Sequence, residues 1–142
     1  MTGTAKTAVI LAWLLWSTSA LAGPPVIELG RYSAVTESEW SMILALNADG
    51  LATLEVASWE PGESAQAKVD RYSGRWHSEK ADVVVRFKEG EAILNYHPRL
   101  SFQEFGRKGS CPGLVGVSAT FVRHLLVGRS LWLEQELRKL KW

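Results

Sequence analysis

The sequence predicts an all-β fold, an antiparallel up-and-down meander of seven or eight strands that forms a closed or partly open barrel. Apolar residues alternate with polar ones through the middle of the chain, which is typical of strands with one buried face. Short segments with a turn glycine separate these runs. Because a meander exposes unpaired edges unless its sheet closes, we expect the strands to roll into a barrel.

The first predicted hairpin joins residues 40–46 to residues 51–59. In the first of these runs, Trp40, Met42 and Leu44 fall on one face of the strand, and intervening residues such as Ser41 fall on the opposite face. Residues 47–50 read Asn-Ala-Asp-Gly, and an Asp-Gly step supplies the positive φ that tight hairpins require.

Further strands are expected at residues 68–77, 82–87 and 92–97. In the first, Tyr72, Gly74 and Trp76 share one face, and Arg75 and His77 lie on the other. Pro98 should end the strand at 92–97, because proline cannot donate to a strand ladder.

The glycine-rich residues 98–113 are then expected to form a long connection. Strands are predicted at 114–119 and at 130 to about 136, while residues 120–127 fit no single pattern. The C-terminal residues fit either a terminal strand or a short helix, because Leu133, Leu137 and Leu140 also have helical spacing.

Residues 1–22 have the pattern of a secretory signal peptide. An apolar run at 8–16 precedes the Ala20-Leu21-Ala22 step, which fits signal-peptidase cleavage. Cleavage there leaves residues 23–142 as one domain, placed in the periplasm or outside the cell. The run is too short to span a bilayer, so no membrane span is expected after the signal is removed.

Charge and motif content disfavour several classes of function. Lys6 is the only charged residue of 1–22, so the remaining chain carries 15 basic and 15 acidic residues, a balance that disfavours nucleic-acid binding. No serine-hydrolase elbow, phosphate-binding loop or Cys-His constellation is present, so no enzyme and no cofactor are expected. The spacing of the candidate carboxylates Glu28, Asp70 and Glu104 does not indicate an active site.

Metal and disulfide chemistry are likewise disfavoured. The three histidines, His77, His97 and His124, lack the spacing of a metal site. Cys111 is the only cysteine, which excludes a disulfide within the chain. Its Ser-Cys-Pro-Gly context suggests a loop, where it could be free, buried or paired with another chain.

A glycine–arginine–aromatic step occurs twice, as Gly30-Arg31-Tyr32 and as Gly74-Arg75-Trp76. The glycine–x–tryptophan version resembles the signature of lipocalin-like barrels, and the strand order over residues 27–97 resembles the N-terminal barrel of the envelope lipoprotein NlpE. The resemblance implies a barrel with an apolar cavity and no chemistry. Copper sensing does not carry over, because the lipidated cysteine and the Cys-x-x-Cys of that lipoprotein are missing.

Two functions follow as hypotheses, both without catalysis. The first is a binding module for a small apolar or amphipathic ligand, with a cavity lined by aromatic residues: Trp40, Trp59, Tyr72, Trp76 and Tyr96. The alternative is a protein-interaction module of the cell envelope, an inhibitor or assembly factor, that acts through the 98–113 loop. Candidate contacts in that loop combine aromatic and basic residues, Phe102, Phe105, Arg107 and Lys108. Folding of the two phenylalanines onto the mouth of the barrel is an equally open alternative.

Overall fold

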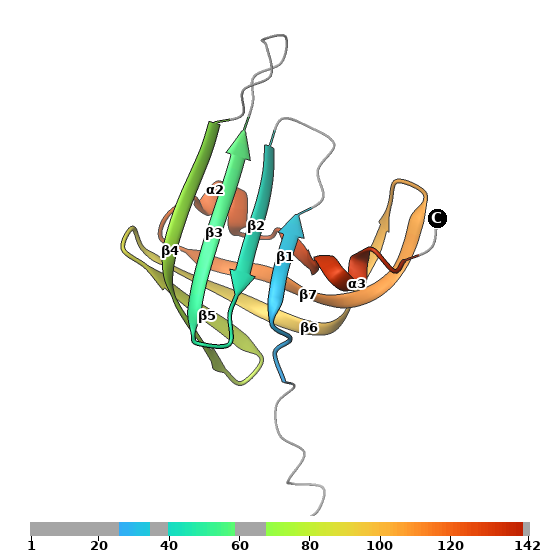
Figure 1. Cartoon of the computed structure of the whole chain (residues 1–142), viewed down its shortest axis with the longest axis horizontal. Helices are drawn as coiled ribbons and strands as arrows, with labels where there is room; N and C mark the ends of the chain where they lie inside the picture. The colour runs from blue at the N-terminus through green and yellow to red at the C-terminus, as the bar shows by residue number, and fades with distance from the viewer. Residues whose placement is uncertain (1–25, 35–39, 59–67, 141–142) are drawn as a thin grey trace, which may run out of the picture.

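The computed structural model describes residues 26–34, 40–58 and 68–140. Eight antiparallel strands follow one another in up-and-down order and close into a barrel, which confirms the predicted fold class (Figure 1). The expected signal peptide and the cavity candidate Trp59 lie outside the described residues.

Each strand pairs with its neighbours in the chain. The strands are β1 (Gly30–Ala34), β2 (Trp40–Leu46), β3 (Leu51–Ser58), β4 (Lys68–Glu79), β5 (Asp82–Phe87), β6 (Glu91–Glu104), β7 (Arg107–Ala119) and β8 (Ser130–Leu133). The upper end of the barrel is defined here as the end where β1, β3, β5 and β7 finish, and the lower end as the end where they begin. Short helices follow the last strands, α2 (Arg123–Leu126) before β8 and α3 (Glu134–Leu137) after it.

The barrel closes through a short seam between its first and last strands. Tyr32 pairs with Leu133, and Ser33 pairs with Trp132. Tyr32 and Leu133 are fully buried, so the seam is fastened by backbone pairing and by side chains of the core.

A contiguous hydrophobic core fills the space inside the strands. The alternating residues Met42, Leu44 and Leu46 point inward, as predicted, and are at most 1% exposed. Leu54 and Leu94 join them from β3 and β6. An eight-stranded barrel has an interior just wide enough for side chains of this size to fill.

The long connection predicted at 98–113 is wrong. β6 continues through Pro98 to Glu104, and β7 begins at Arg107, so the two strands form a hairpin that extends past the rest of the barrel (Figure 1). The register shifts between His97 and Leu100. This irregularity accommodates Pro98, because a proline is tolerated at a bulge or at a strand edge.

Of the two structures expected for the C-terminal residues, a terminal strand or a short helix, the chain forms the helix after Leu133. β8 stops at Leu133, so the strand predicted to reach residue 136 is too long, and residues 134–137 form α3 instead. Leu133 and Leu137 are both buried, consistent with their helical spacing. Among the described residues, no helix is long and apolar enough to cross a membrane.

Gly74 lies where β4 and β5 approach each other closely. It pairs with Phe87, and a Cβ at this position would fall on the backbone carbonyl of Arg86. Only glycine leaves that space empty. The glycine of the Gly74-Arg75-Trp76 step is therefore required by strand packing.

We predict that Gly74→Ala lowers the free energy of unfolding by about 1–3 kcal/mol, the usual cost of forcing atoms into a packed region. The neighbouring exposed Ser73 provides a matched control, and Ser73→Ala should change stability by less than about 0.5 kcal/mol. Urea denaturation of the two variants checks this. Equal stability of the two would show that β5 can move away from Gly74 freely.

Candidate functional site

The lower end of the barrel is occupied by two tyrosines and the segment that precedes β1. The Tyr32 hydroxyl donates a hydrogen bond of 2.6 Å to the backbone carbonyl of Glu28, and Ile27 beside it is buried. Tyr96 is 4% exposed. Burial raises the pKa of both tyrosine hydroxyls, so both stay protonated and can act as hydrogen-bond donors.

Trp76 lies at the same end and is half-buried. Its indole Nε1 donates a hydrogen bond of 2.9 Å to the carbonyl of Asn47, in the turn between β2 and β3. The ring packs against the core cluster. Trp76 therefore ties β4 to the β2–β3 turn.

The upper end carries a group of three aromatic rings. Tyr72, Phe87 and Phe121 meet edge to face, with ring centroids 5.2–6.4 Å apart. Phe121 comes from the connection that contains α2, which covers this end from β7 (Figure 1). Nearby, the guanidinium of Arg129 lies 4.7 Å from the centroid of the Trp40 ring.

The four described cavity candidates are thus divided between the two ends. Trp40 and Tyr72 lie toward the upper end and Trp76 toward the lower end, while Tyr96 is part of the buried core. All four pack against the same hydrophobic cluster. A ligand held by them would contact the upper or the lower end of the core rather than one common cavity wall.

The hairpin of residues 98–112, called the arm below, has a small hydrophobic cluster of its own. Phe102 is 2% exposed and packs with Cys111 and Leu137, and its ring meets Trp132 edge to face at 5.1 Å. The Arg107 guanidinium lies over the Phe102 ring, 5.9 Å from its centroid. Of the two arrangements open for this ring, an exposed contact or packing onto the barrel, the structure shows packing, and the ring holds the arm against β8 and α3.

Phe105 forms the tip of the arm. It is 39% exposed, and with Gly106 it makes a two-residue turn in which φ is +56° and +76°. Tight hairpins prefer asparagine or aspartate before glycine, and a bulky side chain at positive φ is disfavoured. Strain of this kind gathers at functional positions. Lys108 is exposed beside the tip.

Cys111 lies in β7 rather than in a loop, and it is 4% exposed. Burial raises the pKa of its thiol to about 11, with a smaller contribution from the charge of Glu136. The thiol is therefore protonated at neutral pH and covered by the arm cluster. This environment disfavours the pairing with another chain that the sequence left open.

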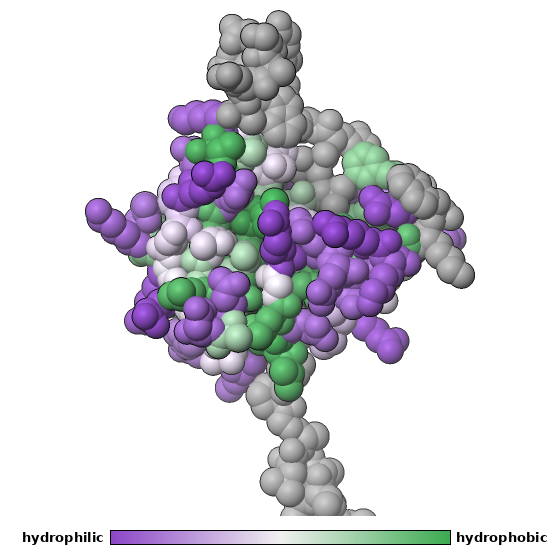
Figure 2. Space-filling model, viewed as in Figure 1, coloured by the Kyte–Doolittle hydropathy of each residue, from purple (hydrophilic) through white to green (hydrophobic). Residues whose placement is uncertain are grey.

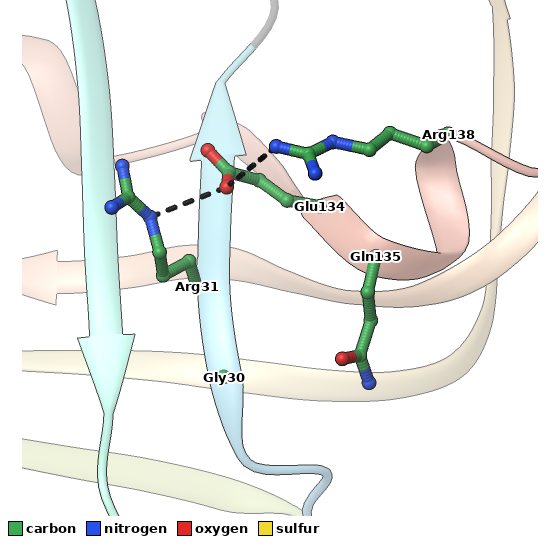
Figure 3. A pocket seen from close by; sticks show the side chains of 5 residues that line it. All are labelled: Gly30, Arg31, Glu134, Gln135 and Arg138. Carbon is green, nitrogen blue, oxygen red and sulfur yellow. Dashed lines mark ion pairs between the residues drawn. The ribbon is translucent and has the colours of Figure 1, made fainter.

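A polar pocket of about 460 Å³ lies between the start of β1 and α3. Its lining consists of Gly30, Arg31, Glu134, Gln135 and Arg138, and the two arginines approach the same carboxylate oxygen (Figure 3). The Arg31 guanidinium is 3.2 Å from Glu134, and that of Arg138 is 3.9 Å away. Exposed ion pairs contribute about 0–1 kcal/mol to stability, so these two contacts add only modestly to the attachment of α3 to β1. Hydrophilic side chains cover this side of the molecule, to the right in Figure 2.

The polar residues considered for chemistry stay apart. Asp70 pairs with Val56 in the sheet, Glu104 lies beside the tip of the arm, and Glu28 precedes β1. His77 contacts Glu79 at 2.9 Å on the exposed face of β4. Within the described ranges, no three histidine, cysteine or acidic side chains gather where they could hold a metal ion.

Comparison with known proteins gave no relative: no family model, no curated protein and no solved structure matches this chain. The candidate site therefore rests on geometry alone. The arm is the feature that distinguishes this molecule from a plain closed barrel.

We predict that Phe105→Asn raises the free energy of unfolding by about 1 kcal/mol, because asparagine tolerates the positive φ that phenylalanine resists. Leu51→Asn is a matched control, since Leu51 is 42% exposed and has no positive φ. That variant should not gain stability in the same urea titration. A loss of stability in Phe105→Asn would show that the ring is needed for packing.

Proposed function

We propose that this protein is a non-enzymatic interaction module of the cell envelope, which binds another protein through the tip and the outer side of its arm. The observation that carries the proposal is Phe105, an exposed aromatic side chain held at positive φ. The turn would be more stable with another residue, so the ring is better explained by a contact with a partner.

The organisation of the arm supports this proposal. Phe102 and Trp132 anchor its base, so the tip is presented on a rigid support. A surface that is ordered before binding loses little conformational entropy when a partner arrives. Exposed aromatic and basic side chains, here Phe105 and Lys108, are common in contact surfaces.

The packing of the barrel also favours a contact on the outside. Its core side chains form one contiguous cluster, which leaves the arm as the best-defined projecting feature of the described residues. The signal-like residues 1–22 support export, and with it a partner in the periplasm or outside the cell.

Site-specific photo-crosslinking tests the proposal. A benzophenone amino acid at position 105 should crosslink one envelope protein. Position 51 is the matched control, because it is similarly exposed, and the same group there should not crosslink that protein. In unlabelled protein, Phe105→Asn should lose the partner at unchanged or increased stability. The same crosslinked products from both positions, or full partner recovery by Phe105→Asn, would refute the proposal.

A second candidate function is the binding of a small apolar or amphipathic ligand at the upper end. The half-buried ring of Tyr72 and its neighbours Phe87 and Phe121 favour it, because these rings could receive an acyl chain. The resemblance to lipocalin-like barrels and to the NlpE domain supports this candidate, since it implies an apolar cavity.

Titration with a fatty acid and a lysophospholipid tests this second candidate. We expect saturable changes in tryptophan fluorescence, since Trp40 lies at the upper end. Phe121→Ala should weaken the response, while Leu51→Ala should leave it unchanged. Fluorescence that stays constant up to the critical micelle concentration would exclude it.

A further inference from the structure

The outer edge of β6 within the arm has no paired strand among the described residues. Pairing between β5 and β6 ends with Asp82 opposite Asn95, followed by a last hydrogen bond of 2.8 Å from Tyr96 N to the carbonyl of Ala81. Residues 98–104 then continue as a strand paired with β7 alone. Such an edge presents unpaired N–H and C=O groups that can accept a further strand.

This edge strand is held in place by its other neighbour, β7. Leu100 pairs with Cys111 and Phe102 with Gly109, and the Phe102 ring is buried beneath them. The edge is therefore ordered before any partner arrives. Strand addition to a preformed edge gains main-chain hydrogen bonds without first ordering the receiving strand.

The exposed face of the arm is basic and polar. Ser101 and Gln103 lie on it, paired with Ser110 and Lys108 of β7. Arg99 is exposed at the register shift, on the edge strand itself. No acidic side chain of the described residues lies on this face, because Glu104 and Arg107 pair on the face of Phe102.

Building on the interaction function proposed above, we infer that the partner adds an extended, acidic segment to the edge of β6 at residues 98–104. An added strand would lie about 4.8 Å from β6, next to Arg99. Lys108 would be one strand further, about 10 Å away and thus near one Debye length at 0.1 M salt. Acidic side chains at alternate positions of the segment would face both cations.

Peptide titration followed by NMR of the full mature chain tests the inference. The probe is an eight-residue peptide in which valine and glutamate alternate. It should shift the backbone amides of residues 98–104, more strongly at low salt. A peptide with lysine in place of glutamate should bind at least fivefold more weakly. The peptide is also made in two N-methylated versions, which carry methyl groups on alternate sets of backbone amides. The version whose methyl groups lie on the edge that hydrogen-bonds to β6 should not bind.

Charge variants sharpen this test. Arg99→Glu should weaken the acidic peptide at least fivefold, whereas Lys88→Glu, an exposed change at the β5–β6 turn, should have little effect. The inference is overturned if the acidic peptide shifts no amide of 98–104, if the lysine peptide binds equally well, or if both N-methylated versions still bind. Shifts of the same amides with protein concentration alone would instead assign the edge to a second copy of the chain.

The peptide titration and the crosslinking experiment can fail independently, so failure of strand addition can be told apart from failure of the proposed interaction function. Crosslinking from position 105 together with a silent peptide titration would leave the interaction function standing and reject strand addition. A positive titration without any crosslink from position 105 would support the edge and reject the tip as the contact.

Discussion

The structure depends on the seam that closes the barrel between β1 and β8. Among the described residues, two residue pairs form it, Tyr32 with Leu133 and Ser33 with Trp132, and each also takes part in contacts outside the seam. Tyr32 is fully buried and holds the Glu28 backbone across the lower end. Trp132 packs on Phe102 and so fixes the base of the arm. The chain turns into α3 directly after Leu133, where Glu134 pairs with Arg31 of β1.

This coupling explains how the arm is anchored to the barrel. A free two-stranded hairpin is marginally stable in water, whereas this one shares a hydrophobic cluster with β8 and α3. The positive φ of Phe105 can persist because the pairing below it determines the turn. Among the described residues, the edge of β6 in the arm is left open because β5 is shorter than β6.

Much of the barrel could be predicted from period-two alternation, since Met42, Leu44 and Leu46 have both the pattern and the burial of a strand. The arm could not, because Pro98 and the glycines at 106 and 109 read locally as breakers, while a register shift and tertiary contacts accommodate them. The alternation of Leu100 and Phe102 was the signal that could have extended β6. The Arg31–Glu134 contact also has no local signature, because these two residues lie near opposite ends of the chain and are brought together only when the barrel closes.

Native-state hydrogen exchange, followed by NMR as a function of urea, tests most directly whether the seam holds the molecule together. Amides hydrogen-bonded across the seam, around Tyr32 and Trp132, are expected to exchange only through global unfolding and to share its urea dependence. Amides on the open edge of β6 should exchange much faster. If the seam amides exchange by a urea-independent local opening while β2, β3 and β4 stay protected, the seam does not hold the molecule together.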